Sequence, residues 1–571
     1  MKSNFCIKIL IILPKPSSID TTNYNYFFPI GLAYISSVLK NNGYFVDCLN
    51  CYHESGANRD IIRHKLDHNL YDFICTGNTA LGYNETAELI DEVRNHKSKP
   101  DIILGGVIIT AEPYIVFNDL KPTYGVLGDG EETIIELLNH IIAKKSLTDV
   151  LGIIYKGYDG EIVINKPRKI FGDLDLIPFP DFESLSYYEK LEKNIYSTEN
   201  VFASNIIDKY RPYYIMASRS CPYSCTFCYH ESKYRERSIE NVFAEIEEVI
   251  IKHKINYIFL IDEVLATKKN KERLLLLCRK MSELRSKITW GVYWCCQMKV
   301  DVVDEELLEI MKNAGCLLIS YGFESYSPAV LKSMRKSITP KQIDNTFKNT
   351  LKAKIAVQAN FIFFDIAETS STVSETLKYW KENACDQINL APLKPYPGSG
   401  IYKYCITNGI INDSLEFLKH IGDMKDYAYN MTTDMKDYEV LETINKFDYL
   451  SVKYRKAAKP ENILEVGKNL YKISVVCPYC GSVVDYDILL DNIRWFAVKK
   501  VCGICSYRFL VTSTYNYYFE VLSRRKIFYY IFHKLKRNIK QLLIKYIPYF
   551  MNKYGDTYQE TIKIISKTES V

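Results

Sequence analysis

The sequence has no apolar run that approaches the ~18 residues a membrane-spanning helix needs. It also lacks an export signal, because Lys8 interrupts the first apolar stretch and prolines follow where a small-residue cleavage site is required. A reducing compartment is therefore expected, in which the 17 cysteines of the 571-residue chain bind metals rather than form disulfides. These absences predict a cytoplasmic protein and exclude an integral membrane protein or a disulfide-stabilised secreted one.

Acidic residues are absent from residues 524–553, which contain nine Lys and Arg. Subtracting these nine from the formal net charge of +5 leaves −4 for the rest, so the basic character is confined to the C-terminus. Apolar residues recur there at helical spacing: Ile527, Ile531, Leu535, Ile539, Leu542 and Tyr546. Residues 513–571 are therefore expected to be a basic amphipathic tail with peripheral membrane contact, nucleic acid being the less favoured partner. The alternative is a helix packed on its own protein with a solvated basic face.

The first 150 residues alternate between short apolar runs and segments with helical spacing. The strand-like runs begin at residues 8, 44, 71, 100 and 124, and helical patterns cover 31–43, 84–96 and 131–145. Such alternation predicts a doubly wound parallel sheet whose ligands lie beyond the carboxyl ends of its strands. Residues 151–205 are expected to form a hairpin and a linker, because a DG turn separates two strand-like segments there.

A second alternation begins at Tyr213 and contains six strand–helix units, the last of which ends near residue 409. A full barrel has eight units, so residues 206–410 are predicted to form a partial (β/α)6 barrel with its chemistry at the carboxyl ends of the strands. Residues 411–472 show mostly helical patterns and are expected to be a helical extension. The predicted fold class is therefore α/β: a doubly wound sheet, a partial barrel and a small C-terminal zinc-ribbon-like module.

Three cysteines follow the first strand of this barrel within one short loop, SRSCPYSCTFCYH. Cys221, Cys225 and Cys228 have the spacing C-x-x-x-C-x-x-C, and the loop contains no fourth cysteine. Three thiolates suit a [4Fe–4S] cluster that leaves one iron open, whereas an electron-transfer cluster normally has four protein ligands. The alternatives are a three-cysteine zinc site and three unligated thiols.

Residues 213–410 resemble the radical S-adenosylmethionine (SAM) superfamily, and CPYSCTFC is among the most specific motifs of that family. The resemblance implies that the amino and carboxylate groups of S-adenosylmethionine chelate the open iron. One electron, from a donor such as flavodoxin or ferredoxin, then breaks the sulfur–C5′ bond and gives methionine and a 5′-deoxyadenosyl radical. The cofactor carries the difficult chemistry, while the barrel supplies orientation and excludes water.

The same resemblance implies roles for several side chains. Phe227 matches an aromatic position near the adenine, with shielding of the cluster as the alternative. Asp262 and Glu263 end the strand where relatives contact the ammonium of S-adenosylmethionine, although a solvated strand end would also place acids there. Glu324 in SYGFES matches a strand end that holds the ribose hydroxyls, and the basic pair 335–336 either neutralises the carboxylate or lies on the surface. Beyond the cluster ligands, no catalytic side chain is identified.

One segment departs from the family pattern. Relatives usually have FIxGLPGET where this chain has FIFFDIAET at residues 361–369. Phe364, Ile366 and Ala367 replace the glycines and the proline. We therefore expect a different backbone in this loop and a changed substrate side of the site.

Residues 1–150 resemble the cobalamin-binding domain that precedes many barrels of this family. The matching strings are GNTALGY (77–83), LGGVIIT (104–110) and GDGEETI (128–134), in which glycines let the backbone approach a bulky nucleotide tail. The residues expected to contact cobalamin are Thr79, Leu81, Gly105, Gly106, Gly128 and Glu131. The cobalt-binding Asp-x-His-x-x-Gly string is absent, as in many radical enzymes of this group. An empty domain that packs on the barrel is the alternative.

Two further cysteine pairs lie in residues 473–512. Cys477 and Cys480 in CPYCG are separated by 21 residues from Cys502 and Cys505 in CGIC. Four thiolates at this spacing indicate a tetrahedral structural zinc, which also contributes folding energy to a small module. A second [4Fe–4S] cluster with four ligands is the alternative. A catalytic zinc is not expected, because no coordination position stays open.

Together these features predict a radical enzyme that uses cobalamin to transfer a methyl group to an unactivated carbon of a small molecule or biosynthetic intermediate. The radical abstracts a substrate hydrogen, and methylcobalamin donates the methyl group. A second hypothesis keeps the radical but ends in cyclisation, rearrangement or oxidation, as in an oxidoreductase. A third hypothesis, motivated by the four-cysteine module and the basic tail, is a non-catalytic adaptor for nucleic acid or a membrane.

Overall fold

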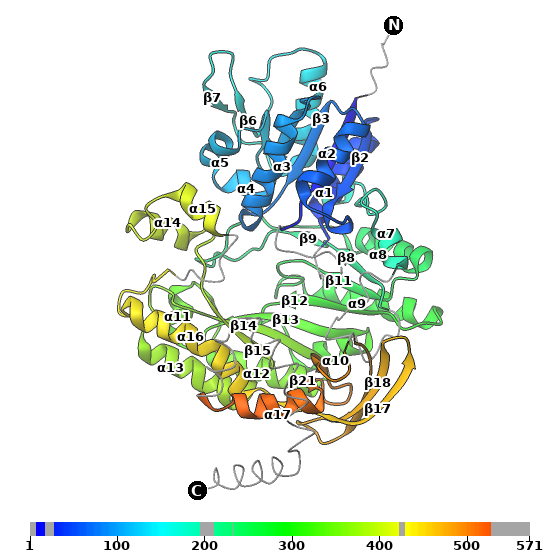
Figure 1. Ribbon diagram of the computed structural model, residues 1–571, viewed down its shortest axis with the longest axis vertical. Helices are drawn as coiled ribbons and strands as arrows, with labels where there is room; N and C mark the ends of the chain where they lie inside the picture. Colours follow the sequence, from blue (N-terminus) through cyan, green and yellow to red (C-terminus); the bar gives the residue numbers. More distant parts are fainter. Residues whose placement is uncertain are drawn as a thin grey trace.

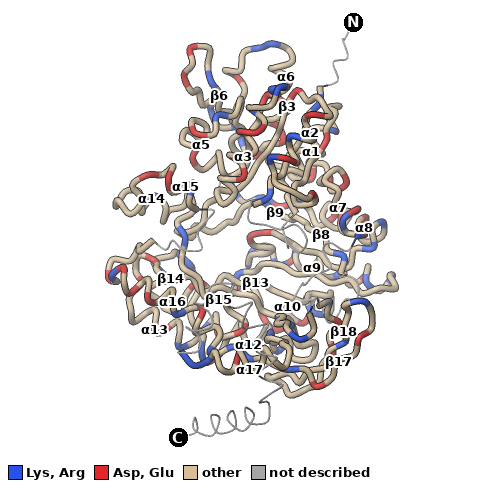
Figure 2. Tube along the Cα trace, in the orientation of Figure 1, with Lys and Arg blue, Asp and Glu red and all other residues tan. Residues whose placement is uncertain are grey.

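The computed structural model describes residues 7–16, 28–193, 210–230, 232–421, 429–490 and 492–526 (Figure 1). A first α/β unit, a parallel barrel-like sheet and a small β-rich unit follow one another from top to bottom in that view. Acidic and basic residues are interspersed over all three (Figure 2). Among the described residues, no helix is both long and apolar enough to span a membrane. The predicted basic tail lies outside them from Ile527 onward.

The first unit is a seven-stranded sheet in the order β2-β1-β3-β4-β5-β6-β7. Five strands pair in parallel, as predicted: β1 (Lys8–Leu13), β2 (Phe45–Asn50), β3 (Phe73–Gly77), β4 (Asp101–Gly105) and β5 (Tyr124–Val126). Ile9 and Ile11 of β1 face the core that includes α1 (Ile30–Asn41) and α6 (Gly130–Ile142). Leu10 and Ile12 face the opposite core, which includes α2 (Asn58–His68), α3 (Tyr83–Asn95) and α5 (Pro113–Leu120). β1 is apolar at successive positions because both faces of the sheet are covered.

The predicted hairpin belongs to this sheet. β6 (Ile153–Lys156) pairs antiparallel with β5, and β7 (Ile162–Ile164) pairs antiparallel with β6. The DG turn between the two strands is local and was therefore visible in the sequence. Their attachment to β5 is a long-range contact that the sequence pattern did not indicate.

The second sheet has six parallel strands in the order β15-β14-β13-β12-β11-β8, which confirms the partial barrel. The strands are β8 (Pro212–Ile215), β11 (Tyr257–Leu260), β12 (Tyr293–Met298), β13 (Cys316–Glu324), β14 (Ala356–Phe363) and β15 (Ile388–Pro392). The intervening helices are α8 (Ile239–His253), α9 (Lys271–Lys287), α10 (Glu305–Asn313), α11 (Pro328–Ser333), α12 (Pro340–Lys352) and α13 (Ser370–Tyr379). Helix α14 (Gly400–Thr407) follows the last strand. The carboxyl ends of β12 and β13 face the first unit, because Met298 and Glu324 line one cavity with Thr79 and Leu81.

The predicted helical extension is only partly helical. Helices α15 (Ser414–Ile421) and α16 (Asp437–Tyr454) fit the prediction, but β16 (Ala457–Ala458) and β17 (Pro460–Gly467) are strands. Proline and the β-branched residues of PENILEVG disfavour a helix there. The β-rich unit therefore begins before residue 473, and it continues with β18 (Leu470–Val476), β19 (Val483–Leu489), β20 (Ala497–Val501), β21 (Arg508–Thr512) and α17 (Thr514–Ser523).

This β-rich unit covers the amino-terminal end of the barrel. Val501 packs with Tyr257, Cys295, Leu318 and Ala356, which lie on four neighbouring barrel strands. Gln387 exchanges two hydrogen bonds of 2.9 Å with the backbone of Arg508. The opposite, carboxyl-terminal end of the barrel is thus the end that faces the first unit (Figure 1).

Candidate functional site

The three-cysteine loop is fixed at both of its ends and in its middle. It leaves β9 (Ser218–Arg219), which pairs antiparallel with β10 (Arg235–Glu236) and closes the base of the loop. In the middle of the loop the Thr226 N–H donates to the Met334 carbonyl oxygen at 3.2 Å. The Thr226 carbonyl accepts a hydrogen bond from the Ile401 N–H at 2.8 Å, where α14 begins. Contacts from distant parts of the barrel therefore set the position of the cysteines.

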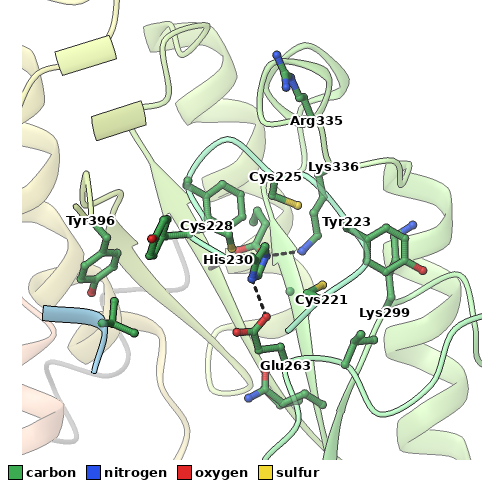
Figure 3. Close-up of a pocket in the computed structure, with 18 of the residues that line it drawn as sticks. Cys221, Tyr223, Cys225, Cys228, His230, Glu263, Lys299, Arg335, Lys336 and Tyr396 are labelled. Atoms are coloured by element: carbon green, nitrogen blue, oxygen red, sulfur yellow. Dashed lines mark hydrogen bonds and ion pairs between the residues drawn. The ribbon is translucent and has the colours of Figure 1, made fainter. Parts of the chain in front are cut away.

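Cys221, Cys225 and Cys228 all line one cavity of about 560 Å³ at the carboxyl ends of the strands (Figure 3). The predicted residues Phe227 and Glu263 line the same cavity. Three soft thiols that converge on one cavity are a donor set suited to an iron–sulfur cluster. The geometry thus fits the predicted cluster ligands, with free space beside them for a small molecule.

Glu324 and Lys336 form an ion pair in the cavity wall. Lys336 Nζ lies 2.7 Å from Glu324 Oε1, and both side chains are largely buried. Burial alone would lower the pKa of Lys336, but the charge of Glu324 and the nearby Cys225 raise it overall. A side chain at Gly322 would clash with both partners, which explains the glycine in SYGFES. Arg335, in contrast, points away from the thiols (Figure 3).

His230 lies in the site although the sequence analysis assigned it no role, and it is two residues after Cys228 in CYH. Its Nδ1 lies 2.9 Å from Glu263 Oε2, and donor atoms of Cys221, His230 and Glu263 lie within 4.8 Å of one another. Hydrogen bonds with the sulfur atoms of Cys221 and Cys228, together with Glu263, raise the pKa of His230 to about 12. The imidazole ring of His230 therefore lies beside two of the predicted cluster ligands.

Asp262, predicted to contact S-adenosylmethionine, is instead a buried structural residue. Its carboxylate accepts hydrogen bonds from the Ala217 N–H at 3.3 Å and from the Ser218 hydroxyl. It is not among the described residues that line the cavity, and burial raises its pKa to about 6. Adjacent residues after a strand point to opposite sides. Glu263 consequently faces the cavity while Asp262 links the ends of two strands.

The segment with the altered family pattern packs into the core. Phe364, which replaces a family glycine, has a φ of +78°, a region that favours glycine. Its N–H donates to Glu368 Oε2 at 3.2 Å, and its ring stacks on Phe447 of α16. None of residues 361–369 lines the 560 Å³ cavity in the part of the chain described. Contrary to the expectation, the substitutions here change core packing rather than the wall of that cavity.

A second cavity, of about 840 Å³, lies at the carboxyl ends of the first sheet. It is lined by all six residues predicted to contact cobalamin: Thr79, Leu81, Gly105, Gly106, Gly128 and Glu131. Gly106 has a φ of +84°, and a Cβ there would lie 2.8 Å from the Asn78 carbonyl oxygen. The backbone can make this close turn at the cavity wall only with glycine. The cavity and its glycine cradle therefore fit a large nucleotide-bearing ligand.

The two cavities adjoin. Thr79, Leu81 and Val107 of the first unit line both of them. An ion-pair network joins the same two regions: Arg219 Nη2 lies 2.5 Å from Glu131 Oε1, and Arg235 Nη1 lies 2.6 Å from Asp129. These pairs connect the turn before α6 to the base of the cysteine loop. Sequence reasoning missed both arginines, since their partners lie about a hundred residues away along the chain.

The C-terminal cysteines form a separate cluster. The sulfur atoms of Cys477, Cys480, Cys502 and Cys505 all lie within 4.8 Å of one another. The Cys477–Cys505 and Cys480–Cys502 sulfur distances are both 3.8 Å. Four converging thiols fit the ligand set of a structural zinc ion.

Two family models match this chain. Residues 215–380 match the radical SAM superfamily, and residues 18–138 match the B12 binding domain. A protein described as an uncharacterized methyltransferase of Pyrococcus horikoshii is 26% identical over 418 residues, which are 71% of this chain and 84% of that protein. An anaerobic magnesium-protoporphyrin IX monomethyl ester cyclase of Rubrivivax gelatinosus is 26% identical over 469 residues, 79% of this chain and 77% of the relative.

Solved structures with the same fold support this match. The radical S-adenosylmethionine methyltransferase TsrM of Kitasatospora setae superposes with a TM-score of 0.57 at 16% identity, covering 70% of this chain and 76% of TsrM. The cobalamin-dependent S-adenosylmethionine radical enzyme OxsB superposes with a TM-score of 0.54 at 17% identity, covering 78% of this chain and 61% of OxsB. At such low identity these structures establish a shared fold.

Proposed function

Because the chain belongs to the radical S-adenosylmethionine superfamily and carries a B12-binding domain, we propose that it is an enzyme that methylates an unactivated carbon of a small molecule. The observation that carries this proposal is the wall of Thr79, Leu81 and Val107, which lines both cavities. A substrate carbon held at this wall would lie between the two cofactor sites. The chain can thereby keep one substrate carbon oriented toward both cofactor sites without releasing the substrate.

A bound [4Fe–4S] cluster with S-adenosylmethionine would supply a 5′-deoxyadenosyl radical, and bound cobalamin would supply the methyl group. The chain's own residues bind and orient these groups. Cys221, Cys225 and Cys228 are the cluster ligands in this proposal. The glycine cradle at Gly105 and Gly106 would receive the nucleotide tail of cobalamin, and Thr79 would offer a hydroxyl to it.

Four side chains in the first cavity are suited to S-adenosylmethionine. Glu263 can accept a hydrogen bond from its ammonium group, and Phe227 offers a ring face for the adenine. Glu324 has one oxygen bound to Lys336 and a second oxygen for the ribose hydroxyls. Lys299, Arg335 and Lys336 all line this cavity, and Lys336 is the one of them that is paired with Glu324. A flavodoxin- or ferredoxin-type protein is the proposed electron donor.

We further propose that Cys477, Cys480, Cys502 and Cys505 bind a structural zinc ion. Each of the four positions of a tetrahedral ion then has a protein ligand, so the site has no room for a substrate. The close approach of all four sulfur atoms supports this proposal. Metal analysis distinguishes zinc from a second iron–sulfur cluster, because the latter would add about four irons per chain.

A second candidate function is cyclisation or oxidation of the substrate without methyl transfer. It is favoured by the similarity to a cyclase that extends over 79% of this chain. Both candidates require the same cysteine loop, so the loop does not distinguish them. The product does, because methylation adds one carbon from S-adenosylmethionine to the substrate.

The test is anaerobic reconstitution with iron, sulfide and cobalamin, followed by reduction and addition of S-adenosylmethionine carrying a labelled methyl group. We expect 5′-deoxyadenosine in the absence of substrate, and a labelled methylated product once a substrate is supplied. Deoxyadenosine without label transfer would instead support the cyclase-type function. A loaded, reduced protein that makes no deoxyadenosine would contradict both and favour the non-catalytic adaptor.

A further inference from the structure

Two short basic segments meet on the surface of the described chain. Residues 453–459 and 524–526 together contain seven Lys and Arg and no Asp or Glu. The first segment ends α16 and leads into β17, and the second follows α17. We call these two segments the basic corner. It lies at the lower end of the molecule beside α16 and α17 (Figures 1 and 2).

Specific contacts hold the basic corner together although its segments are far apart along the chain. Arg524 Nη2 donates to the Arg455 carbonyl oxygen at 3.3 Å, and the Tyr449 hydroxyl donates to the Arg524 carbonyl oxygen at 3.1 Å. Three acids in the described chain interact with the corner. Glu520 is bound by Arg455 at 2.9 Å, Asp386 Oδ2 accepts a hydrogen bond from the Lys456 N–H at 2.8 Å, and Glu442 lies near Lys526. The fold therefore brings seven cations together with three acids, which leaves an excess of positive charge.

Aromatic rings lie among the cations of this surface. Lys453 Nζ lies 5.8 Å from the ring centroid of Tyr449 and 5.5 Å from that of Tyr454. Lys459 lies 5.9 Å from the ring of Tyr518 in the same way. Rings with a polar end and long lysine side chains are the residues that settle at the boundary between lipid headgroups and acyl chains.

Helix α16 extends this surface with exposed apolar side chains. Tyr438 is 62% exposed and Leu441 is 51% exposed. At 3.6 residues per turn Tyr438 lies on the same face of α16 as Tyr449 and Lys453, and Leu441 borders that face. The exposed acid Glu442 also lies on it and pairs with Lys446 at 2.7 Å. Apolar side chains exposed beside cations suit binding to a membrane interface better than binding to a nucleic-acid duplex. A protein contacts the backbone of a duplex through its phosphate groups, and exposed apolar side chains do not contribute to such contacts.

The sequence that continues from the corner has the same character. The described chain ends at Lys526, and residues 527–553 add six further Lys and Arg and no acid. We propose that the basic corner is a docking surface for a membrane that contains anionic lipids, and that it binds their phosphate groups. Both cavities are lined by Thr79, Leu81 and Val107 of the first unit, whereas α17 lies at the opposite end of the molecule (Figure 1). Docking through the corner is therefore compatible with access to the cavities.

The test uses the full-length chain and sedimentation with phosphatidylcholine vesicles that either contain or lack phosphatidylglycerol. The variant reverses four exposed lysines of the corner, K453E/K456E/K459E/K526E. The matched control reverses four exposed lysines of the first unit, K144E/K145E/K156E/K166E, and has the same net charge. Melting curves establish that both variants fold as the wild type does.

We expect the wild type and the control to bind phosphatidylglycerol vesicles, and to lose binding at high salt. The corner variant should bind at least about tenfold more weakly, since each cation near an anionic surface contributes to binding. Equal binding by the corner variant and the control would overturn the proposal. It would also be overturned if duplex DNA or RNA competed the protein off the vesicles at equal phosphate concentration, because the corner would then be a nucleic-acid site.

Discussion

Two groups of cysteines in this chain place the same side chain in opposite surroundings. The loop of Cys221, Cys225 and Cys228 provides three thiols that line a cavity, with charged and aromatic residues around the remaining space. The C-terminal group provides four thiols that converge on one another at the far end of the barrel. The number of thiols and the free space beside them separate a site for chemistry from a site that maintains structure.

The largest expected effect comes from breaking the first group. Cys225→Ala removes one of three cluster ligands, so deoxyadenosine formation should fall to the level of protein without iron. Iron and sulfide analysis measures the cluster content, and quantification of 5′-deoxyadenosine measures the activity. Zinc content should stay at the wild-type level, and a simultaneous loss of zinc would contradict the independence of the two groups.

Breaking the second group should affect stability instead. Cys502→Ser should release the zinc ion and lower the free energy of unfolding by several kcal/mol, because binding of a structural metal contributes to folding. Thermal unfolding with and without a chelator measures the change. The molecules that remain folded should form deoxyadenosine at the wild-type rate per cluster. A variant that keeps full stability and full zinc would show that Cys502 is not a ligand.

The ion pair in the cavity wall provides an intermediate case. Lys336→Met leaves the buried Glu324 carboxylate without its partner, and uncompensated buried charges are costly. We expect the KM for S-adenosylmethionine to rise by about a hundredfold, with cluster content unchanged. Lys332→Met is the matched control, because its exposed side chain does not line the cavity, and its effect should stay below about tenfold. Equal effects of the two variants would argue against a cavity role for Lys336.

The smallest effect on the protein is expected at Glu368. This residue lies in the segment 361–369, which packs into the core and does not line the cavity. Burial raises the pKa of Glu368 to about 7 despite hydrogen bonds from Thr372 and Phe364. An acid with a raised folded pKa contributes stability below its unfolded pKa of about 4.3, and this contribution is lost as pH rises through 7. Glu368→Gln should therefore remove about 2 kcal/mol of pH dependence in unfolding between pH 5 and 8. Unchanged pH dependence would exclude the proposed titration.

Local patterns made much of the fold and part of the site predictable. The spacing of the cysteines in both groups and the alternation of the two sheets are short-range features of the sequence. The sequence alone could not show which of Asp262 and Glu263 lines the cavity, because this depends on which side of the strand end faces the cavity. The Arg219–Glu131 and Arg235–Asp129 pairs join residues about a hundred positions apart, and no single-chain pattern indicates such partners. β17 was mistaken for helix although Pro460 and the β-branched residues of PENILEVG disfavour one, and its antiparallel pairing with β18 agrees with that local preference.

The packing of Val501 beneath the barrel has a practical consequence for protein engineering. Tyr257, Cys295, Leu318 and Ala356 form an apolar patch at the open base of an incomplete barrel, and the C-terminal unit covers it. A shortened chain limited to the two family-matched regions would leave this patch in contact with water and prone to self-association. Shortened chains and domain exchanges should therefore keep the barrel and the four-cysteine unit together.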